Sequence, residues 1–326
     1  MSEQTIGASV PFDMETEPSR FAASVRSFLK FLRRKKLGAV GLAIVLMVFV
    51  TAVFAPVLSR YDPNFIFDEP NPGYKINPSI PDLAADPDIG SPIVVRQFLN
   101  PSFEHWFGTD KFGRDNYARV VFGARLSLQV GLGASMIAVT LGLLIGVFSA
   151  FYLGIADLII QRFIDALQAF PAIVLLLLLV QIAEPSVRNT VLALGFIGIP
   201  ITTRLIRSSV LVVRTSDYVE AARSLGASDT RIMLRHVLPN IASIVLIAFS
   251  IGIGAYIIFE ATISFLGVGP RNVISWGKMI QEGRTALDLH PWLTVFAGGA
   301  ITTVVVGFNF LGDALRDVLD PRLRGR

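Results

Sequence analysis

Long apolar runs separated by polar stretches dominate the hydropathy pattern of the chain. A helix needs about 20 apolar residues to cross a hydrocarbon core about 30 Å thick. Runs that meet or approach this length predict membrane-spanning helices at 37–58, 126–153, 164–183, 190–213, 241–266 and 292–312. The pattern therefore predicts an all-α polytopic membrane protein with six transmembrane helices.

The fourth run is the least regular of the six. Only 14 residues separate Asn189 from Arg204, a helical length of roughly 21 Å. Extending the span to 213 gives a sufficient length but includes Arg204 and Arg207, at a cost of about 2.5–3.5 kcal/mol each at the centre of a membrane. We expect both guanidinium groups to reach an interface; a role in contacting substrate is the alternative.

Basic residues beside the spans predict the orientation of the chain, because Lys and Arg are retained on the cytoplasmic side. Six of them precede the first span with no acid among them: Arg26, Lys30, Arg33, Arg34, Lys35 and Lys36. The resulting organisation is a cytoplasmic tail at 1–36, a first span at 37–58, an outer segment at 59–118, a core with five spans at 119–318, and a cytoplasmic tail at 319–326. The loop 216–240 then lies on the cytoplasmic side.

The loop 216–240 is polar, yet it carries the signals that begin and end helices. Asp217 with Glu220 three residues later resembles a capping box, and Gly226 suits the left-handed position after a helix. Ser228 caps a second helix, on which Ile232 is among the apolar residues of one face, before Pro239 ends it. We therefore predict two short helices in this loop.

Small side chains distinguish the first of these two helices. Ala221 and Ala222 would let another protein approach its backbone closely, with Glu220 available to a cationic or amide group. A solvated hairpin that contains ordinary helix-forming alanines explains the same residues. Spacing alone leaves both interpretations open.

Within the spans, a few residues raise questions of pathway or packing. Glu260 near the outer end of the fifth span needs a partner, either in gating and solute passage or in a structural hydrogen bond. Pro171 and Pro200 can bend the third and fourth helices, whether or not these line a pathway. Gly142 and Gly146 form a GxxxG pair, which predicts close packing against a neighbouring helix.

Composition agrees with a membrane protein: 52% of residues are hydrophobic and 17% are charged. The absence of cysteine excludes disulfides and thiolate metal sites, and the three histidines are too scattered to predict a metal site. A net charge of +4, without a basic stripe interleaved with aromatic residues, argues against nucleic-acid binding. No GxxxxGK[ST] motif is present, so the chain has no phosphate-binding loop for ATP.

Several segments resemble the membrane permeases of ABC importers. EAARSLGASDTRIMLRHVLPN at 220–240 is similar to the EAA loop of these permeases, with Glu220, Ala221, Ala222, Gly226 and Pro239 at the family's positions. Segments 107–128, 165–171, 260–269, 275–280 and 308–324 resemble the second, C-type permease of the dipeptide, oligopeptide and nickel branch. The resemblance covers nearly everything after about residue 25.

This resemblance implies a type I permease fold and a non-catalytic subunit of an ATP-driven importer in a bacterial or archaeal cytoplasmic membrane. The implied partners are a homologous second permease, two ABC ATPases that carry ATP and Mg²⁺, and an extracytoplasmic binding protein that delivers the solute. The EAA loop, 216–240, would transmit the movement of the ATPases. The implied solutes are di- or oligopeptides, with nickel chelates, glutathione or another small solute as the alternative.

Two other classes of membrane protein compete with this interpretation. A secondary transporter or channel needs ionisable residues deep in its spans or a selectivity filter, and the span centres offer almost no ionisable residues. A membrane-embedded enzyme needs a reactive constellation, and the sequence contains neither HExxH nor GxSxG.

Overall fold

The computed structural model describes residues 36–70 and 93–319. Residues 37–326 form one compact unit. Apart from their inner ends, the predicted tails at 1–36 and 319–326 lie outside the described residues, as do residues 71–92 of the predicted outer segment.

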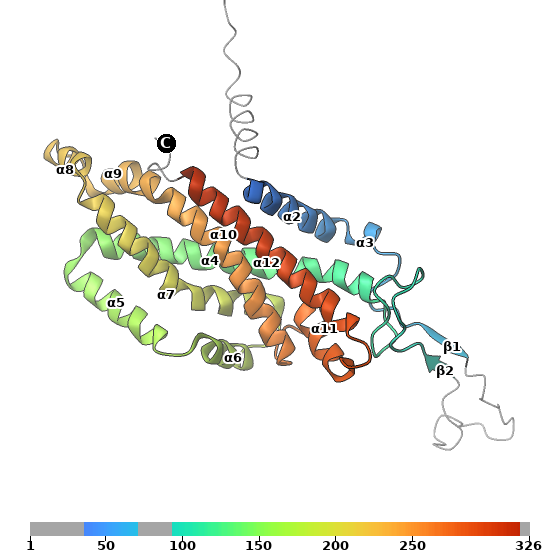
Figure 1. Cartoon of the computed structure of the whole chain (residues 1–326). Coiled ribbons are helices and arrows are strands. Elements are labelled where there is room, and N and C mark those ends of the chain that lie inside the picture. Colours follow the sequence, from blue (N-terminus) through green and yellow to red (C-terminus); the bar gives the residue numbers. More distant parts are fainter. Residues whose placement is uncertain (1–35, 71–92, 320–326) are drawn as a thin grey trace, which may run out of the picture. The chain divides into compact units, whose positions relative to one another are not determined.

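Helices make up nearly all of the regular structure in the described ranges (Figure 1). They are α2 (Lys36–Val53), α3 (Ala55–Leu58), α4 (Asn116–Tyr152), α5 (Gly154–Gln168), α6 (Ala172–Ile182), α7 (Val187–Arg214), α8 (Asp217–Ser224), α9 (Asp229–Ile232), the π-helix η2 (Met233–Val237), α10 (Leu238–Phe265), α11 (Trp276–Gly283), the 3₁₀ helix η3 (Arg284–Ala286) and α12 (Trp292–Leu319). The short strands β1 (Asp68–Pro70) and β2 (Ile93–Val95) pair in antiparallel.

Five helical stretches of the described chain are long and apolar enough to cross a membrane: α2, α4, α7, the continuous stretch from α9 through α10, and α12. The third predicted span, 164–183, is not one straight helix, because α5 and α6 meet at an angle of 86°. Pro171 stands directly before α6 and cannot continue the hydrogen bonding of α5. The predicted bend at Pro171 is confirmed, and six spans result only when this bent pair counts as one.

Two other predicted boundaries shift for local reasons. The second span begins at Asn116 rather than at 126, because the carboxylate of Asp115 caps α4 by accepting a hydrogen bond from the Ala118 backbone N–H at 2.8 Å. The fourth span has the longer of the two lengths considered from the sequence, because α7 continues past Arg204 to Arg214. Pro200 is buried within this helix.

Close packing of α4 against α7 depends on glycine. A Cβ atom at Gly142 would lie 2.7 Å from Thr202 Cβ, and one at Gly146 would lie 2.8 Å from the Thr203 carbonyl oxygen. Neither distance is compatible with a side chain, so the GxxxG pair lets the two backbones approach. The predicted packing role of both glycines is confirmed.

Pro239 does not end the second helix of the loop 216–240, contrary to the prediction. The chain passes from α9 into the π-helix η2 and then directly into α10, with Pro239 in the first turn of α10. The backbone N–H of Leu238 donates to the Met233 carbonyl, five residues back. The wider π turn changes the hydrogen-bond register just before the proline, so the helix continues despite the missing N–H.

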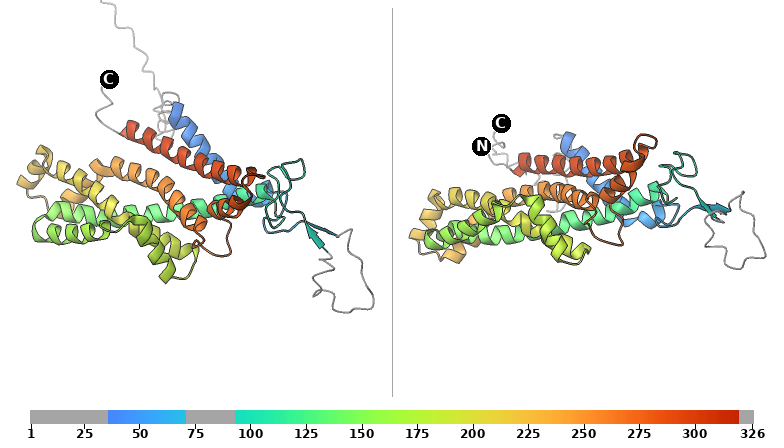
Figure 2. Two further views of the ribbon diagram at one scale, coloured as in Figure 1. Left: turned by 60° about the horizontal axis from the view of Figure 1, so that its bottom comes forward. Right: turned by 90° about the horizontal axis from the view of Figure 1, so that it is seen from below.

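The two ends of the unit differ in the elements that they contain. Figures 1 and 2 show α8 and α9 at one end, and α11 with the β1–β2 pair at the opposite end. Helices α4 and α10 contribute to all three buried apolar clusters between these ends, and α12 packs mainly against α10. Elements at one end are therefore connected to the other through α4 and α10.

Candidate functional site

The loop 216–240 connects α7 to α10 and contains α8 and α9. The capping box predicted on Asp217 and Glu220 is not formed: Ser216 occupies the N-cap position, and no side chain caps α8. The Ser216 hydroxyl donates instead to the Val213 carbonyl at 2.6 Å, at the end of α7. Asp217 therefore lies in the first turn of α8, where its charge favours the helix N-terminus.

Gly226 ends α8 as predicted. It has φ +79°, its N–H donates to the Arg223 carbonyl at 2.9 Å, and the Ala227 N–H donates to the Ala222 carbonyl at 3.1 Å. This pair of bonds is the Schellman arrangement, which favours glycine. The predicted cap on Ser228 is also confirmed, because its hydroxyl accepts from the Arg231 N–H.

The inner face of the loop is packed against the spans. Val219 of α8, Ile232 of α9 and Val237 of η2 are buried. They belong to one apolar cluster whose further members are Val147, Ala150 and Phe151 of α4, Ile206 and Val210 of α7, and Ile241 of α10. The predicted apolar face is confirmed, and a displacement of α8 must move or strain the contacts with three spans.

The outer face of α8 presents groups without partners. Glu220 and Ala221 are exposed, and the Glu220 carboxylate forms no ion pair with any described residue. Leu225 is 88% exposed. Ala222 was expected to lie, like Ala221, on a face open to another protein. It is instead half-buried and packs against the inner cluster. The exposed leucine was not singled out in the sequence, where it looks like an ordinary helix-terminal residue.

Arg204 and Arg207 on α7 form ion pairs with α5. Arg207 binds both carboxylate oxygens of Asp157, with Nε–Oδ1 and Nη2–Oδ2 distances of 2.8 and 2.6 Å, and Asp157 also accepts from Ser149 of α4. Arg204 pairs with Asp165. Each arginine therefore has an acidic partner on the neighbouring helix, which the sequence analysis did not identify.

Glu260 has two hydrogen-bond donors inside its own chain. Its carboxylate is buried, and Oε1 accepts from Ser264 Oγ at 2.7 Å and from Ser275 Oγ at 2.8 Å. Ser275 also caps α11 by accepting from the Gly277 N–H at 3.1 Å. These contacts favour the structural interpretation of Glu260, in which it fixes the start of α11 against α10.

A largely buried ionic cluster lies beside the start of α4. It consists of Asp110, Arg114, Arg119 and Glu282, with two cations and two anions. Arg114 Nη2 lies 2.6 Å from Asp110 Oδ2 and 2.9 Å from Glu282 Oε2, and Arg119 Nη2 lies 3.4 Å from the same glutamate oxygen. Asp110, Arg114 and Arg119 lie within ten residues of one another, whereas Glu282 lies 163 residues after Arg119 and has no local signal in the sequence.

Comparison with known proteins identifies the class. Residues 142–325 match the family model of the binding-protein-dependent transport system inner membrane component, and residues 25–79 match the N-terminal TM domain of oligopeptide transport permease C. The chain is 36% identical to the dipeptide transport system permease protein DppC of Alkalihalophilus pseudofirmus, over 92% of this chain and 90% of that protein. It is 35% identical to the glutathione transport system permease protein GsiD of Escherichia coli, over 95% and 94%.

A solved structure shares the fold. The MetNI methionine ABC transporter in inward-facing conformations contains a chain that matches with a TM-score of 0.53 at 17% identity, over 62% of this chain and 96% of that one. The family model and the relatives together with the spans define a multi-pass membrane subunit of an ABC importer. The chain belongs to the family of binding-protein-dependent transport system inner membrane components.

Membership has consequences for the chemistry of the chain. The family consists of permease subunits, which work with an ATPase, a solute-binding protein and a second permease. Within the described residues, no group of three or more His, Asp or Glu side chains is placed to hold a metal ion.

Proposed function

We propose that this chain is the C-type permease of an importer of di- or oligopeptides and forms the translocation pathway with a homologous second permease. The relatives in the dipeptide and glutathione systems, at 36 and 35% identity over nearly the whole chain, support this solute class. Glutathione is the second candidate, and it is itself a small peptide. A separate binding protein would deliver the solute to the outer side of the membrane.

The loop 216–240 is proposed to lie in the cytoplasm and to dock into an ATPase subunit, which supplies ATP and Mg²⁺. Glu220 and Ala221 supply an unpaired carboxylate and a small surface, Gly226 ends α8, and Pro239 lies in the first turn of α10, where the loop continues into the span. The observation that carries the proposal is the contrast between the two faces of α8: the inner face is packed against α4, α7 and α10, whereas the outer face is exposed.

The remaining topology follows from this placement. Tails 1–36 and 319–326 are proposed to be cytoplasmic, and the segment 59–118 is proposed to face the outer side up to the start of α4 at Asn116. Five further spans are proposed from α4 onward, with the bent pair of α5 and α6 counted as one. Pro171 separates α5 from α6, which makes this pair the proposed place where the spans change between inward-open and outward-open arrangements. For Glu260, the hydrogen bonds to Ser264 and Ser275 favour a structural role over a role in the pathway.

Charge reversal at Glu220 tests the docking proposal. We expect Glu220→Arg to abolish co-purification with the cognate ATPases and ATP-driven uptake of dialanine into proteoliposomes that hold the complete transporter and its binding protein. Glu184→Arg is the matched control, because Glu184 is also exposed but lies between α6 and α7, away from the loop. Unimpaired association and uptake in the Glu220 variant would contradict the proposal.

A further inference from the structure

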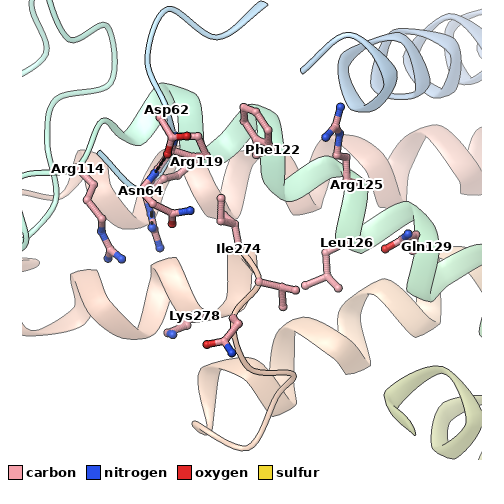
Figure 3. Close-up of a pocket in the computed structure, with 13 residues that line it drawn as sticks. Asp62, Asn64, Arg114, Arg119, Phe122, Arg125, Leu126, Gln129, Ile274 and Lys278 are labelled. Carbon is pink, nitrogen blue, oxygen red and sulfur yellow. Dashed lines mark hydrogen bonds between the residues drawn. The ribbon is translucent and has the colours of Figure 1, made fainter. Parts of the chain in front are cut away.

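A polar pocket lies at the end of the unit opposite to α8. It has a volume of about 630 Å³ and is bordered by the start of α4, by α11 and by the preceding turn at 272–274 (Figure 3). This volume is within the range of sites for small molecules, about 300–1,000 Å³. The lining includes four basic side chains, Arg114, Arg119, Arg125 and Lys278, and one acidic side chain, Asp62.

The four cations are not equally compensated. Arg114 and Arg119 face Asp110 and Glu282, so that this part of the wall is neutral overall. Arg125 donates only to backbone carbonyls at the end of α2, to Ala52 at 2.7 Å and to Val53 at 3.3 Å. The side-chain ammonium group of Lys278 forms no hydrogen bond or ion pair with a described residue. The pocket therefore holds a surplus of positive charge.

An unsatisfied donor lies in the same wall. Arg119 is 2% exposed, and its Nε has no hydrogen-bond partner among the described residues. The nearest carboxylate oxygen, Asp110 Oδ2, is 3.6 Å away. A buried N–H group without a hydrogen-bond partner raises the free energy of the folded protein. An acceptor that enters the pocket would recover this energy, so the donor points to a ligand with oxygen atoms.

The rest of the lining suits the other groups of a peptide. Asn64, Gln129 and Asn272 provide side-chain amides, which both donate and accept hydrogen bonds as a peptide bond does. Asp62 provides a carboxylate: its Oδ1 accepts from the Asn64 N–H at 2.8 Å, and no described cation pairs with it. Figure 3 shows Lys278 on α11 across the pocket from Asn64 and the arginines beside α4.

We infer that this pocket binds the free carboxylate of a short peptide, with Lys278 as its principal counter-ion and the Arg119 Nε–H as an additional donor. The inference rests on the proposed function, since it names the part of the imported solute that the permease itself recognises. Asp62 is the counterpart for the peptide ammonium group. The pocket would then discriminate between a peptide acid and its amide, independently of the binding protein.

Direct binding tests the inference on the detergent-purified transporter without its binding protein. The probes are trialanine and trialanine amide, measured by isothermal titration calorimetry. We expect the acid to bind at least tenfold more tightly than the amide, because the amide lacks the charge that Lys278 compensates. Lys278→Gln is expected to remove this preference, whereas the control Lys111→Gln, outside the pocket lining, is expected to keep it.

The outcomes separate this inference from the proposed function. Equal binding of acid and amide to the unmodified transporter, or an unchanged preference in the Lys278 variant, overturns the pocket assignment, whatever the transporter imports. ATP-driven uptake of trialanine by the complete transporter is measured in parallel. Its absence overturns peptide import as the function without altering the binding result.

Discussion

Two groups of charged residues at opposite ends of this permease differ in burial and in pairing. Around the start of α4, Asp110, Arg119 and Glu282 are buried, Arg114 is partly buried, and the four form an internally compensated ionic cluster. At the other end, Glu220 on α8 is exposed and has no charged partner in the described chain. The ion pairs of the cluster stabilise the fold, whereas the exposed Glu220 carboxylate is available to another molecule.

This difference separates structural charges from functional ones in a membrane subunit. A buried carboxylate or guanidinium group that loses its partner destabilises the protein strongly, whereas an exposed one contributes little to stability. Substitutions within the compensated cluster of Asp110, Arg114, Arg119 and Glu282 should therefore affect folding first. Substitutions on the outer face of α8 should affect association and transport with little change in stability.

The largest expected effect on stability is that of Glu282→Ala. The variant leaves Arg114 and Arg119 with only Asp110, and we expect it to lower the free energy of unfolding by about 3–5 kcal/mol. Thermal unfolding of the purified transporter, followed by tryptophan fluorescence, measures the loss. Glu104→Ala is the control: its side chain is 58% exposed and 3.8 Å from Arg96, so we expect a change below about 1 kcal/mol. Equal losses of unfolding free energy in the Glu282 and Glu104 variants would contradict the distinction between buried, paired charges and exposed ones.

An intermediate effect is expected where α8 contacts the spans. Val219→Ala removes two buried methyl groups from the cluster that joins α8 to α4, α7 and α10, at a cost of roughly 2 kcal/mol. We expect the ATPases to remain bound while ATP-driven uptake decreases, because the outer face is unchanged. The control is Val212→Ala at a side chain that is 69% exposed. Full uptake by the Val219 variant would show that this contact does not transmit movement.

The smallest effect on stability is expected at Leu225. Its side chain is 88% exposed, so Leu225→Ser should change the free energy of unfolding by less than about 0.5 kcal/mol. We nevertheless expect the affinity for the ATPases to fall several-fold, because an exposed leucine at a docking surface loses apolar contact with the partner. Leu289→Ser, at a residue that is 78% exposed at the opposite end, should leave the affinity unchanged. Pull-down titration with the purified ATPases measures both variants.

Much of the fold was predictable because the membrane imposes length and hydropathy on each span. The paired glycines of α4, the extended α7 and the glycine-ended α8 all follow from local patterns. The break between α5 and α6 was only partly predictable. Pro171 indicates a bend, but its angle of 86° depends on packing around both helices.

The residues of the candidate site divide in the same way. Glu220 and Gly226 are recognisable from helix punctuation and family resemblance, since their roles lie within a few neighbouring positions. The partners of Glu260 and Arg119 are harder to find: Ser264 is one helical turn from Glu260, but Ser275 and Glu282 lie on another helix. The sequence pattern indicates that a buried charged side chain needs a partner, but the tertiary structure is required to identify that partner.

The π turn at 233–237 has a mechanical consequence. Because it carries the helix past Pro239, residues 229–265 form one uninterrupted rod of 37 residues, roughly 55 Å long at 1.5 Å per residue. This exceeds the thickness of a hydrocarbon core, about 30 Å. A pivot within the bilayer would turn a small tilt at the Asp229 end into an opposite displacement at Phe265, seven residues before the turn at 272–274 that borders the pocket at the start of α4.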